Sequence, residues 1–220
     1  MSKTLEYKLF KDRIDAAKHL YEELPIDFIG SDELIVLALS DGAVVIADFL
    51  AQKIGCKMDM LLSESIYSQK NPDFEIAKVS ETQEVLIDKK MAKSFDISEE
   101  FIYSEAKRIF EEKLLYRINR FRKGLSLDSF EGKVVLLVDE CVETDFTMSI
   151  AIKTAISNRA KNIYLAAPVI DQFSYEKLVP ISDGIFTPYR KRDYISIEYY
   201  YDNLDEVEAS EIERILKKYE

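Results

Sequence analysis

The sequence predicts an α/β fold built on a doubly wound, mainly parallel sheet. Two observations carry this prediction: apolar, β-rich runs alternate with helical patterns along the chain, and the run at residues 32–40 contains an uninterrupted apolar stretch at 34–39. A continuous apolar run is typical of a strand that helices cover on both faces. The chain has 220 residues, of which 47% are hydrophobic, so it can bury a full core. We expect a single domain over residues 1–220.

The first elements follow this alternation. Residues 10–24 form a helical pattern, because Phe10, Ile14 and Leu20 fall on one face. Gly55 suits the C-cap of the second predicted helix. We predict, in order, a helix at 10–24, a strand at 32–40, a helix at 43–55 and a strand at 57–65.

Residues 64–125 interrupt the alternation. Residues 66–90 show little helical period, so we expect loops and short strands there. A long amphipathic helix is predicted at 98–124, with Ser98 as its N-cap. We interpret this interval as a hood or flap over the edge of the sheet rather than as a separate domain.

The carboxyl-terminal part resumes the strand–helix pattern. Tyr199, Tyr200 and Tyr201 lie in a β-like run, which is either an edge strand with core aromatic rings or a dimer contact. The other predicted elements are a strand at 132–140, a helix at 147–160, a strand at 162–170, a short helix at 173–182, a short strand at 183–189 and a final helix at 205–219.

Composition limits the classes of function. With 41 acidic and 30 basic residues the formal charge is −11, and such a surface repels nucleic acid and anionic lipid. No stretch approaches the roughly 18 apolar residues of a membrane helix, and the amino terminus has no apolar leader segment. His19 is the only histidine, which disfavours nucleophilic triads and histidine-rich metal sites. We expect a cytoplasmic protein whose partner is a small molecule, with no nucleic-acid and no membrane partner.

One basic cluster departs from the acidic average. Arg117, Arg120, Arg122 and Lys123 end the long predicted helix. Cations suit the carboxyl end of a helix and need no ligand there. The alternative is a flap that supplies positive charge to an anionic substrate, and the sequence leaves both interpretations open.

Two strand–helix junctions form the candidate site. In an open α/β sheet, ligands bind where strands end and helices begin, and these junctions are residues 37–45 and 138–148. Asp139 and Glu140 end a buried strand, where two carboxylates can accept hydrogen bonds from a sugar diol. A solvated acidic pair at a strand end is the alternative.

The second junction resembles a known signature. In VDECVETDFTM at 138–148, two acidic residues, two apolar residues and a short turn follow a strand, and a threonine then begins a helix. This pattern resembles the signature of type I phosphoribosyltransferases. The stretch LALSDGAVVIADFLA at 37–51 resembles the pyrophosphate-loop region of bacterial predicted phosphoribosyltransferases. The resemblance extends from about residue 8 to the end of the chain and implies the fold of that superfamily.

The resemblance implies a reaction and a role for each site residue. In such enzymes 5-phosphoribosyl-1-pyrophosphate with Mg²⁺ delivers its ribose to a nitrogen of a base. The paired acids Asp139 and Glu140 would bind the ribose hydroxyls, and Glu143 would face the base; no side chain is assigned as a metal ligand. Two loops would hold the phosphates: Thr144, Asp145, Phe146 and Thr147 the 5′-phosphate, and Ser40, Asp41, Gly42 and Ala43 the pyrophosphate.

Four positions depart from the family pattern. Asp145 stands where the family has glycine, Phe146 where it has a small residue, Asp41 where it has arginine, and Glu64 where it has a basic residue. A carboxylate about 4 Å from a phosphate charge costs on the order of 1 kcal/mol in water and up to about 4 kcal/mol at an effective dielectric near 20. Three acidic positions therefore predict a pocket with a poor electrostatic fit to the donor. Asp145 could instead cap the next helix, for which Thr147 is also a candidate N-cap.

Two classes of function remain open. One is a working phosphoribosyltransferase, in which the arginines of 117–123 and Mg²⁺ offset the acidic loops. The other is a non-catalytic binding or regulatory protein on the same fold, whose ligand is a sugar phosphate, nucleotide or base. A hydrolase that uses Asp139 and Glu140 with a divalent metal has only acidic clustering in its favour. Related proteins commonly self-associate, so the resemblance also implies a homodimer.

Overall fold

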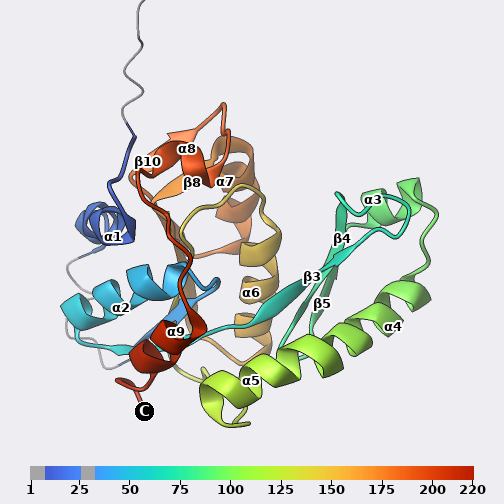
Figure 1. Ribbon diagram of the computed structural model, residues 1–220, viewed down its shortest axis with the longest axis horizontal. Coiled ribbons are helices and arrows are strands. Elements are labelled where there is room, and N and C mark those ends of the chain that lie inside the picture. Colours follow the sequence, from blue (N-terminus) through green and yellow to red (C-terminus); the bar gives the residue numbers. More distant parts are fainter. Residues whose placement is uncertain (1–7, 26–32) are drawn as a thin grey trace, which may run out of the picture.

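A five-stranded parallel sheet forms the centre of the computed structural model, which describes residues 8–25 and 33–220 (Figure 1). The strand order is β2-β1-β6-β7-β9, and every neighbouring pair is parallel. The predicted α/β class with a mainly parallel sheet is therefore confirmed. The strands are β1 (Leu34–Ala38), β2 (Lys57–Met60), β6 (Val134–Val138), β7 (Asn162–Ala166) and β9 (Gly184–Phe186).

Helices cover both faces of this sheet, which explains the continuously apolar strands. Alternate residues of one strand point to opposite faces: Leu136 belongs to one apolar cluster, while Val135 and Leu137 belong to another. The first cluster contains residues of α1, α2 and α9, and the second contains residues of α6. These helices are α1 (Arg13–Glu22), α2 (Ala43–Ile54), α9 (Ala209–Leu216) and α6 (Phe146–Ser157).

The hood is a second, antiparallel layer beside α6 (Figure 1). Its three strands have the order β3-β4-β5, and both neighbouring pairs are antiparallel. It lies in the interval where the sequence predicts a hood, and residues 66–90, expected as loops and short strands, contribute two of its strands. The elements are β3 (Ser63–Tyr67), β4 (Glu75–Ser80), β5 (Val85–Ile87), α3 (Lys89–Ser94), α4 (Glu99–Ile109) and α5 (Leu115–Arg122).

The long predicted helix contains a wide turn. Ser98 caps it as expected, because its hydroxyl accepts a hydrogen bond from Phe101 N at 3.2 Å. A π-helical segment, Phe110–Leu114, separates α4 from α5. The buried side chains of the three segments form one stripe: Ile102, Ala106, Ile109, Leu114, Ile118 and Phe121.

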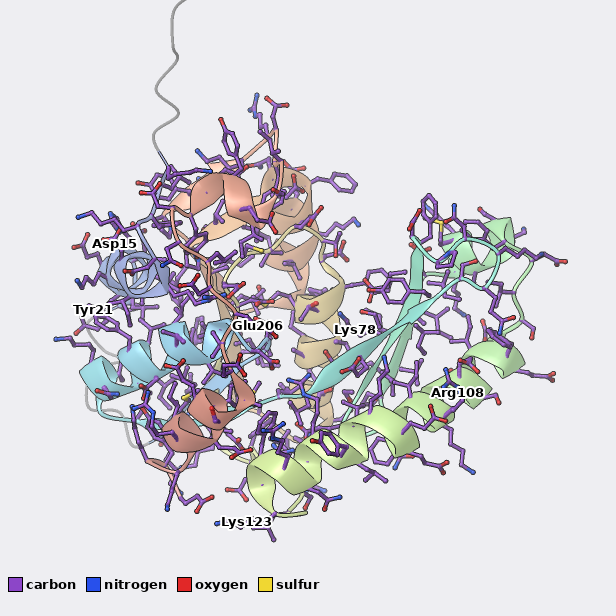
Figure 2. All side chains as sticks on the ribbon, viewed as in Figure 1. Asp15, Tyr21, Lys78, Arg108, Lys123 and Glu206 are labelled. Carbon is purple, nitrogen blue, oxygen red and sulfur yellow. The ribbon has the colours of Figure 1, made fainter. Side chains whose placement is uncertain are left out.

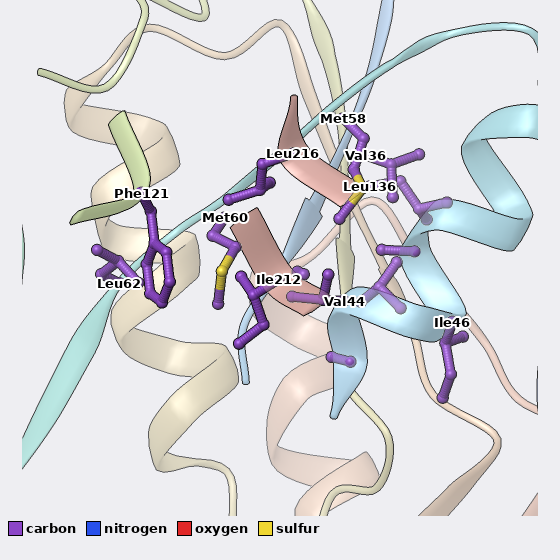
Figure 3. Packing of buried hydrophobic residues seen from close by; sticks show 14 of the residues in the cluster. Val36, Val44, Ile46, Met58, Met60, Leu62, Phe121, Leu136, Ile212 and Leu216 are labelled. Atoms are coloured by element: carbon purple, nitrogen blue, oxygen red, sulfur yellow. The ribbon is translucent and has the colours of Figure 1, made fainter. Parts of the chain in front are cut away.

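The base of the hood is joined to the sheet by apolar packing (Figure 3). Phe121 of α5 belongs to the same buried cluster as Met60 of β2, and so do Ile212 and Leu216 of α9. Arg122 extends this join, since its Nη1 donates to Met60 O at 3.0 Å and lies 3.3 Å from Asp59 Oδ2. The hood is thus anchored to the edge of the central sheet.

Two segments that are each predicted as one strand, 57–65 and 162–170, are divided into two strands in the structure. Residues 57–65 divide into β2 and β3, which belong to different sheets, because the chain leaves the parallel sheet after Met60 and pairs with β4 from Ser63. Residues 162–170 likewise divide into β7 and a strand that pairs with a segment beyond residue 188. The resulting two-stranded parallel sheet consists of β8 (Val169–Asp171) and β10 (Tyr189–Lys191).

The remaining carboxyl-terminal predictions also change. Three tyrosines predicted as a β-like run are mostly helical, because α8 (Ile197–Tyr200) is a single turn and only Tyr201 forms a β-bridge, with Phe10. Tyr199 is partly exposed, whereas Tyr200 and Tyr201 pack on Phe10. The predicted short helix comprises α7 (Gln172–Leu178) and a 3₁₀ turn (Val179–Ile181).

Among the described residues, no helix is both long enough and apolar enough to cross a bilayer.

Candidate functional site

The two candidate loops lie side by side at the carboxyl edge of the sheet. We call residues 40–43 the first loop and residues 139–147 the second loop. They are adjacent because β1 and β6 are paired up to Ala38 and Val138, and Leu39 N donates to Val138 O at 3.0 Å. A hydrogen bond from Ser40 Oγ to Asp139 Oδ1, 2.6 Å long, joins the two loops directly. The topology thus brings together the two junctions that the sequence identifies.

Asp139 is a buried carboxylate. Only 8% of the residue is exposed, and its Oδ1 accepts from Ser40 Oγ and from Glu140 N. The pKa of Asp139 is raised to about 6, mainly by burial and also by the Glu140 charge, while the hydrogen bonds from Ser40 and Glu140 N and the ammonium of Lys78 oppose the rise. Asp139 can therefore hold a proton under mildly acidic conditions.

Glu140 turns toward the first loop. Its Oε2 lies 2.8 Å from Arg13 Nε, and Arg13 Nη1 also donates to Asp205 O at 2.6 Å. A Cβ atom added to Gly42 would lie 1.4 Å from Glu140 Oε2. Gly42 has a φ of −67°, so space and not backbone conformation requires glycine there. The Glu140 carboxylate thus fills the volume next to the first loop.

The second loop is more open. Glu143 and Thr144 are exposed, and Phe146 and Thr147 are the first two residues of α6. Asp145 is the N-cap of α6 with a φ of −73°, but its side chain makes no capping hydrogen bond. The expectation that the Asp145 carboxylate caps the helix is therefore wrong, and so is the choice of Thr147 as N-cap. The carboxylate instead points to Lys177 Nζ, 2.6 Å away.

The three acidic positions are all paired with cations. Arg117 pairs with Asp41 in the first loop and lies 3.5 Å from Glu64, which is also 3.6 Å from Lys113. Asp145 pairs with Lys177. The acidity that the sequence suggests is therefore largely neutralised by side chains from the hood and from α7, and repulsion alone does not describe this edge.

The residues of the basic cluster at 117–123 fit different interpretations: one supplies charge to the site, and the others pair at the end of the helix. Arg117 supplies positive charge to the first loop, as the flap hypothesis expects, although its present partners are carboxylates of the protein. Arg120 pairs with Glu213, and Lys123 pairs with Glu220; both side chains are more than one third exposed. Arg122 is largely buried at the base of the hood.

Lys78 is one of the site's cations that the sequence pattern did not single out, as are Arg13 and Lys177. It lies on β4 of the hood sheet, and its side chain extends toward α6 (Figure 2). The residue is only 8% exposed, and its Nζ donates to Thr147 Oγ1 at 3.0 Å. Glu75 Oε1 is 3.4 Å away. The available signal was a lysine inside an apolar β-like stretch, IAKV at 76–79, in a segment expected to be partly loop.

The carboxylates of this edge offer few protein ligands to a metal ion. In the described part of the chain, no group of three or more His, Cys, Asp or Glu side chains could hold a metal. Asp139 and Glu140 are two carboxylates at one edge. This set fits a Mg²⁺ ion that takes most of its ligands from water and from ligand phosphates, as Mg²⁺ commonly does.

Comparisons with known proteins agree with this architecture. The family model described as "Phosphoribosyl transferase domain" matches residues 5–184. The crystal structure of the protein TT1426 from Thermus thermophilus is 26% identical, with a TM-score of 0.77, and the match covers 96% of this chain and 98% of that chain.

Curated relatives from Mycobacterium tuberculosis point to the same family. Proteins of strains CDC 1551 / Oshkosh and ATCC 25618 / H37Rv, each named "Putative phosphoribosyl transferase", are 24% identical over 163 residues. The match covers 74% of this chain and 36% of each relative, so the chain corresponds to about a third of their length.

Proposed function

Because the chain belongs to the phosphoribosyl transferase domain family, we propose that it binds a ribose phosphate or nucleotide at the second loop but transfers ribose poorly, if at all. In this proposal Asp139 accepts hydrogen bonds from the ribose hydroxyls, together with Glu140 when that side chain leaves Arg13. Glu143 faces the base. Residues 144–147 hold the 5′-phosphate, and residues 40–43 form the pyrophosphate side of the site.

The openness of the second loop supports phosphate binding there. Its turn leads into α6, a helix of 12 residues, and the amino end of a helix favours an anion through its free N–H groups. The hydroxyl of Thr144 is exposed and that of Thr147 faces Lys78. These groups are suitable donors for a phosphate monoester.

The placement of Glu140 carries the second half of the proposal. Its carboxylate is packed against Gly42, in the loop that should hold pyrophosphate. A diphosphate entering this loop must displace Glu140 from Arg13 or accept its charge nearby. Two unit charges about 4 Å apart repel by up to about 4 kcal/mol at an effective dielectric near 20, and a diphosphate carries more than one charge.

Mg²⁺ belongs to this proposal only if transfer is retained. The ion would neutralise the diphosphate leaving group, with Asp139 and Glu140 as the neighbouring carboxylates. The chain's own residues then have simpler tasks: the second loop orients the ribose, and the hood limits the access of water to it.

One observation favours the alternative, a working phosphoribosyltransferase. Asp41, Glu64 and Asp145 are each paired with a cation, so the first loop is less repulsive to pyrophosphate than its sequence suggests. If ligand binding also moved Glu140 away from Gly42, Arg117 would be well placed beside the diphosphate. The two functions therefore differ in whether Glu140 leaves the first loop.

Isothermal titration calorimetry separates these functions. We expect ribose 5-phosphate to bind more tightly than 5-phosphoribosyl-1-pyrophosphate with Mg²⁺, whose Kd should be weaker than about 1 mM because Glu140 occupies the first loop. Thr144→Val, at an exposed position, should weaken ribose 5-phosphate binding several-fold. Micromolar binding of 5-phosphoribosyl-1-pyrophosphate would contradict the proposal and support the enzyme.

The homodimer remains a prediction. Sedimentation velocity on the full chain would measure the mass in solution, and a monomer at all concentrations would exclude it.

A further inference from the structure

Lys78 occupies an unusual position for a lysine. It is on β4, the middle strand of the hood sheet, where all five residues from Ile76 to Ser80 are buried. A buried ammonium needs strong compensation, because the loss of hydration costs more than one ordinary hydrogen bond returns. A lysine here therefore needs partners that satisfy both its charge and its N–H donors.

Those partners use only part of its capacity. An ammonium has three N–H donors, and among the described residues Lys78 donates one hydrogen bond, to the neutral hydroxyl of Thr147. The ion pair with Glu75 is long, at 3.4 Å, and that Glu75 oxygen is buried without a hydrogen-bond partner in the described structure. Lys78 thus points from the hood into the second loop with donors to spare.

The Lys78 side chain brings its ammonium next to the amino end of α6, and both groups favour anions. Thr147 lies in the first turn of α6, so the ammonium stands beside the positive end of a helix. The carboxylates of Glu75 and Asp139 offset part of the repulsion between these two positive groups, and a phosphate monoester that accepts hydrogen bonds from both the ammonium and the helix end would offset more of it. The immediate neighbours of Lys78 on β4, Ala77 and Val79, are apolar, and Glu75 at the start of the strand gives it only the long ion pair.

We propose that Lys78 is a phosphate-binding residue contributed by the hood, whose ammonium is shared between Thr147 and the phosphate monoester of a ribose phosphate. This inference rests on the proposed function and names one further ligand-binding group for the same site. It gives the hood a direct contact with the ligand. A ligand with a phosphate then draws β4 and α6 together, whereas the unphosphorylated sugar lacks this contact.

The test measures ribose 5-phosphate binding by calorimetry for four forms of the full chain. Lys78→Met removes the charge at similar length, and Lys78→Arg keeps it. Lys153→Met is the matched control: Lys153 also joins α6 to the hood, through Val85 O at 2.9 Å and Glu84 at 3.0 Å, but lies away from the second loop.

We expect Lys78→Met to weaken binding at least tenfold, Lys78→Arg to stay within about threefold of the wild type, and Lys153→Met to change nothing. A second measurement, the ³¹P chemical shift of bound ribose 5-phosphate against pH, isolates the electrostatic contact. Lys78 should lower the second pKa of the bound phosphate relative to the Lys78→Met variant, and a purely structural role would leave that pKa unchanged.

The outcomes distinguish the two proposals. If the wild type binds ribose 5-phosphate and Lys78→Met binds it equally well, the role of Lys78 is wrong and the proposed function stands. If Lys78→Met binds more tightly, the ammonium blocks the site instead of serving it, which also overturns the inference. If the wild type fails to bind at millimolar concentration, the proposed function fails and the inference fails with it.

Discussion

The two loops at the carboxyl edge of the sheet differ in what fills them. The first loop is occupied by the protein's own groups: Glu140 packs on Gly42, and Asp41 is paired with Arg117 from the hood. The second loop keeps Thr144 exposed and faces two amines, Lys78 and Lys177.

This difference shows that pocket chemistry depends on side-chain direction as much as on residue type. Both loops carry an aspartate, Asp41 in the first and Asp145 in the second. At the first loop, the neighbouring Glu140 adds a further carboxylate. At the second loop, Lys78 adds an ammonium. We therefore propose the second loop as the better anion site, and the following experiments test that asymmetry.

The largest expected effect concerns Asp139, which links the two loops. Burial raises the pKa of its carboxyl from 3.8 to about 6, so between these values the folded chain binds more protons than the unfolded chain. Its contribution therefore lowers the free energy of unfolding as pH rises through this window. Asp139→Asn removes the titration, and its stability relative to the wild type should rise by on the order of 3 kcal/mol between roughly pH 4 and pH 7.

Urea denaturation at a series of pH values measures this difference. Asp202→Asn, at an exposed position, is the control and should follow the wild type throughout. Curves for Asp139→Asn that run parallel to the wild type at every pH would show that Asp139 ionises normally.

A smaller loss is expected at the first loop. Gly42→Ala forces Glu140 away, because the new Cβ would lie 1.4 Å from Glu140 Oε2 and 2.8 Å from Arg13 Nε. Breaking this partly buried ion pair should lower the free energy of unfolding by about 2 kcal/mol, which chemical denaturation can measure.

The double variant Gly42→Ala/Glu140→Ala sharpens this test. Removing the glutamate removes the clash. Glu140→Ala should therefore lower the free energy of unfolding much less in the Gly42→Ala background than in the wild type. Strictly additive effects would mean that Glu140 does not occupy the first loop in solution.

The smallest effect is expected at the second loop. Asp145→Asn frees Lys177 from its ion pair and removes a carboxylate beside the phosphate position, so the affinity for inorganic phosphate should rise about two- to threefold at low salt. Glu176→Gln on the same helix is the control, because Glu176 contacts Gln172 instead of the loop. An unchanged affinity in Asp145→Asn would show that Asp145 does not oppose anion binding.

The edge of the sheet that carries the site could be predicted from the sequence. Its strands are short, apolar runs that end in polar residues, and both signals are local. The same locality explains the errors at residues 57–65: Leu61 and Leu62 remain apolar while the chain passes from one sheet to another. Nothing within the run marks the change of pairing partner.

The contents of the two loops could be predicted only in part. The resemblance identifies the backbone segments, but the direction of each side chain depends on residues distant in the sequence. The Glu140 side chain is oriented by its ion pair with Arg13, which is 127 positions away in the sequence. Lys78 donates to Thr147, which is 69 positions away. Residue type alone therefore suggested an acidic pocket, whereas the three-dimensional pairing neutralises most of it.

The wide turn between α4 and α5 has a consequence for the first loop. Buried positions follow at intervals of three or four until Ile109, and the next one, Leu114, comes five residues later. One surplus residue rotates everything beyond it by about 100° relative to a regular helix. The wide turn absorbs this extra residue, so Leu114, Ile118 and Phe121 continue the buried stripe and Arg117 lies opposite Asp41. A segment shorter by one residue would continue as a regular helix on the same stripe and keep the guanidinium beside the aspartate, whereas closing the wide turn without a deletion would rotate the guanidinium away.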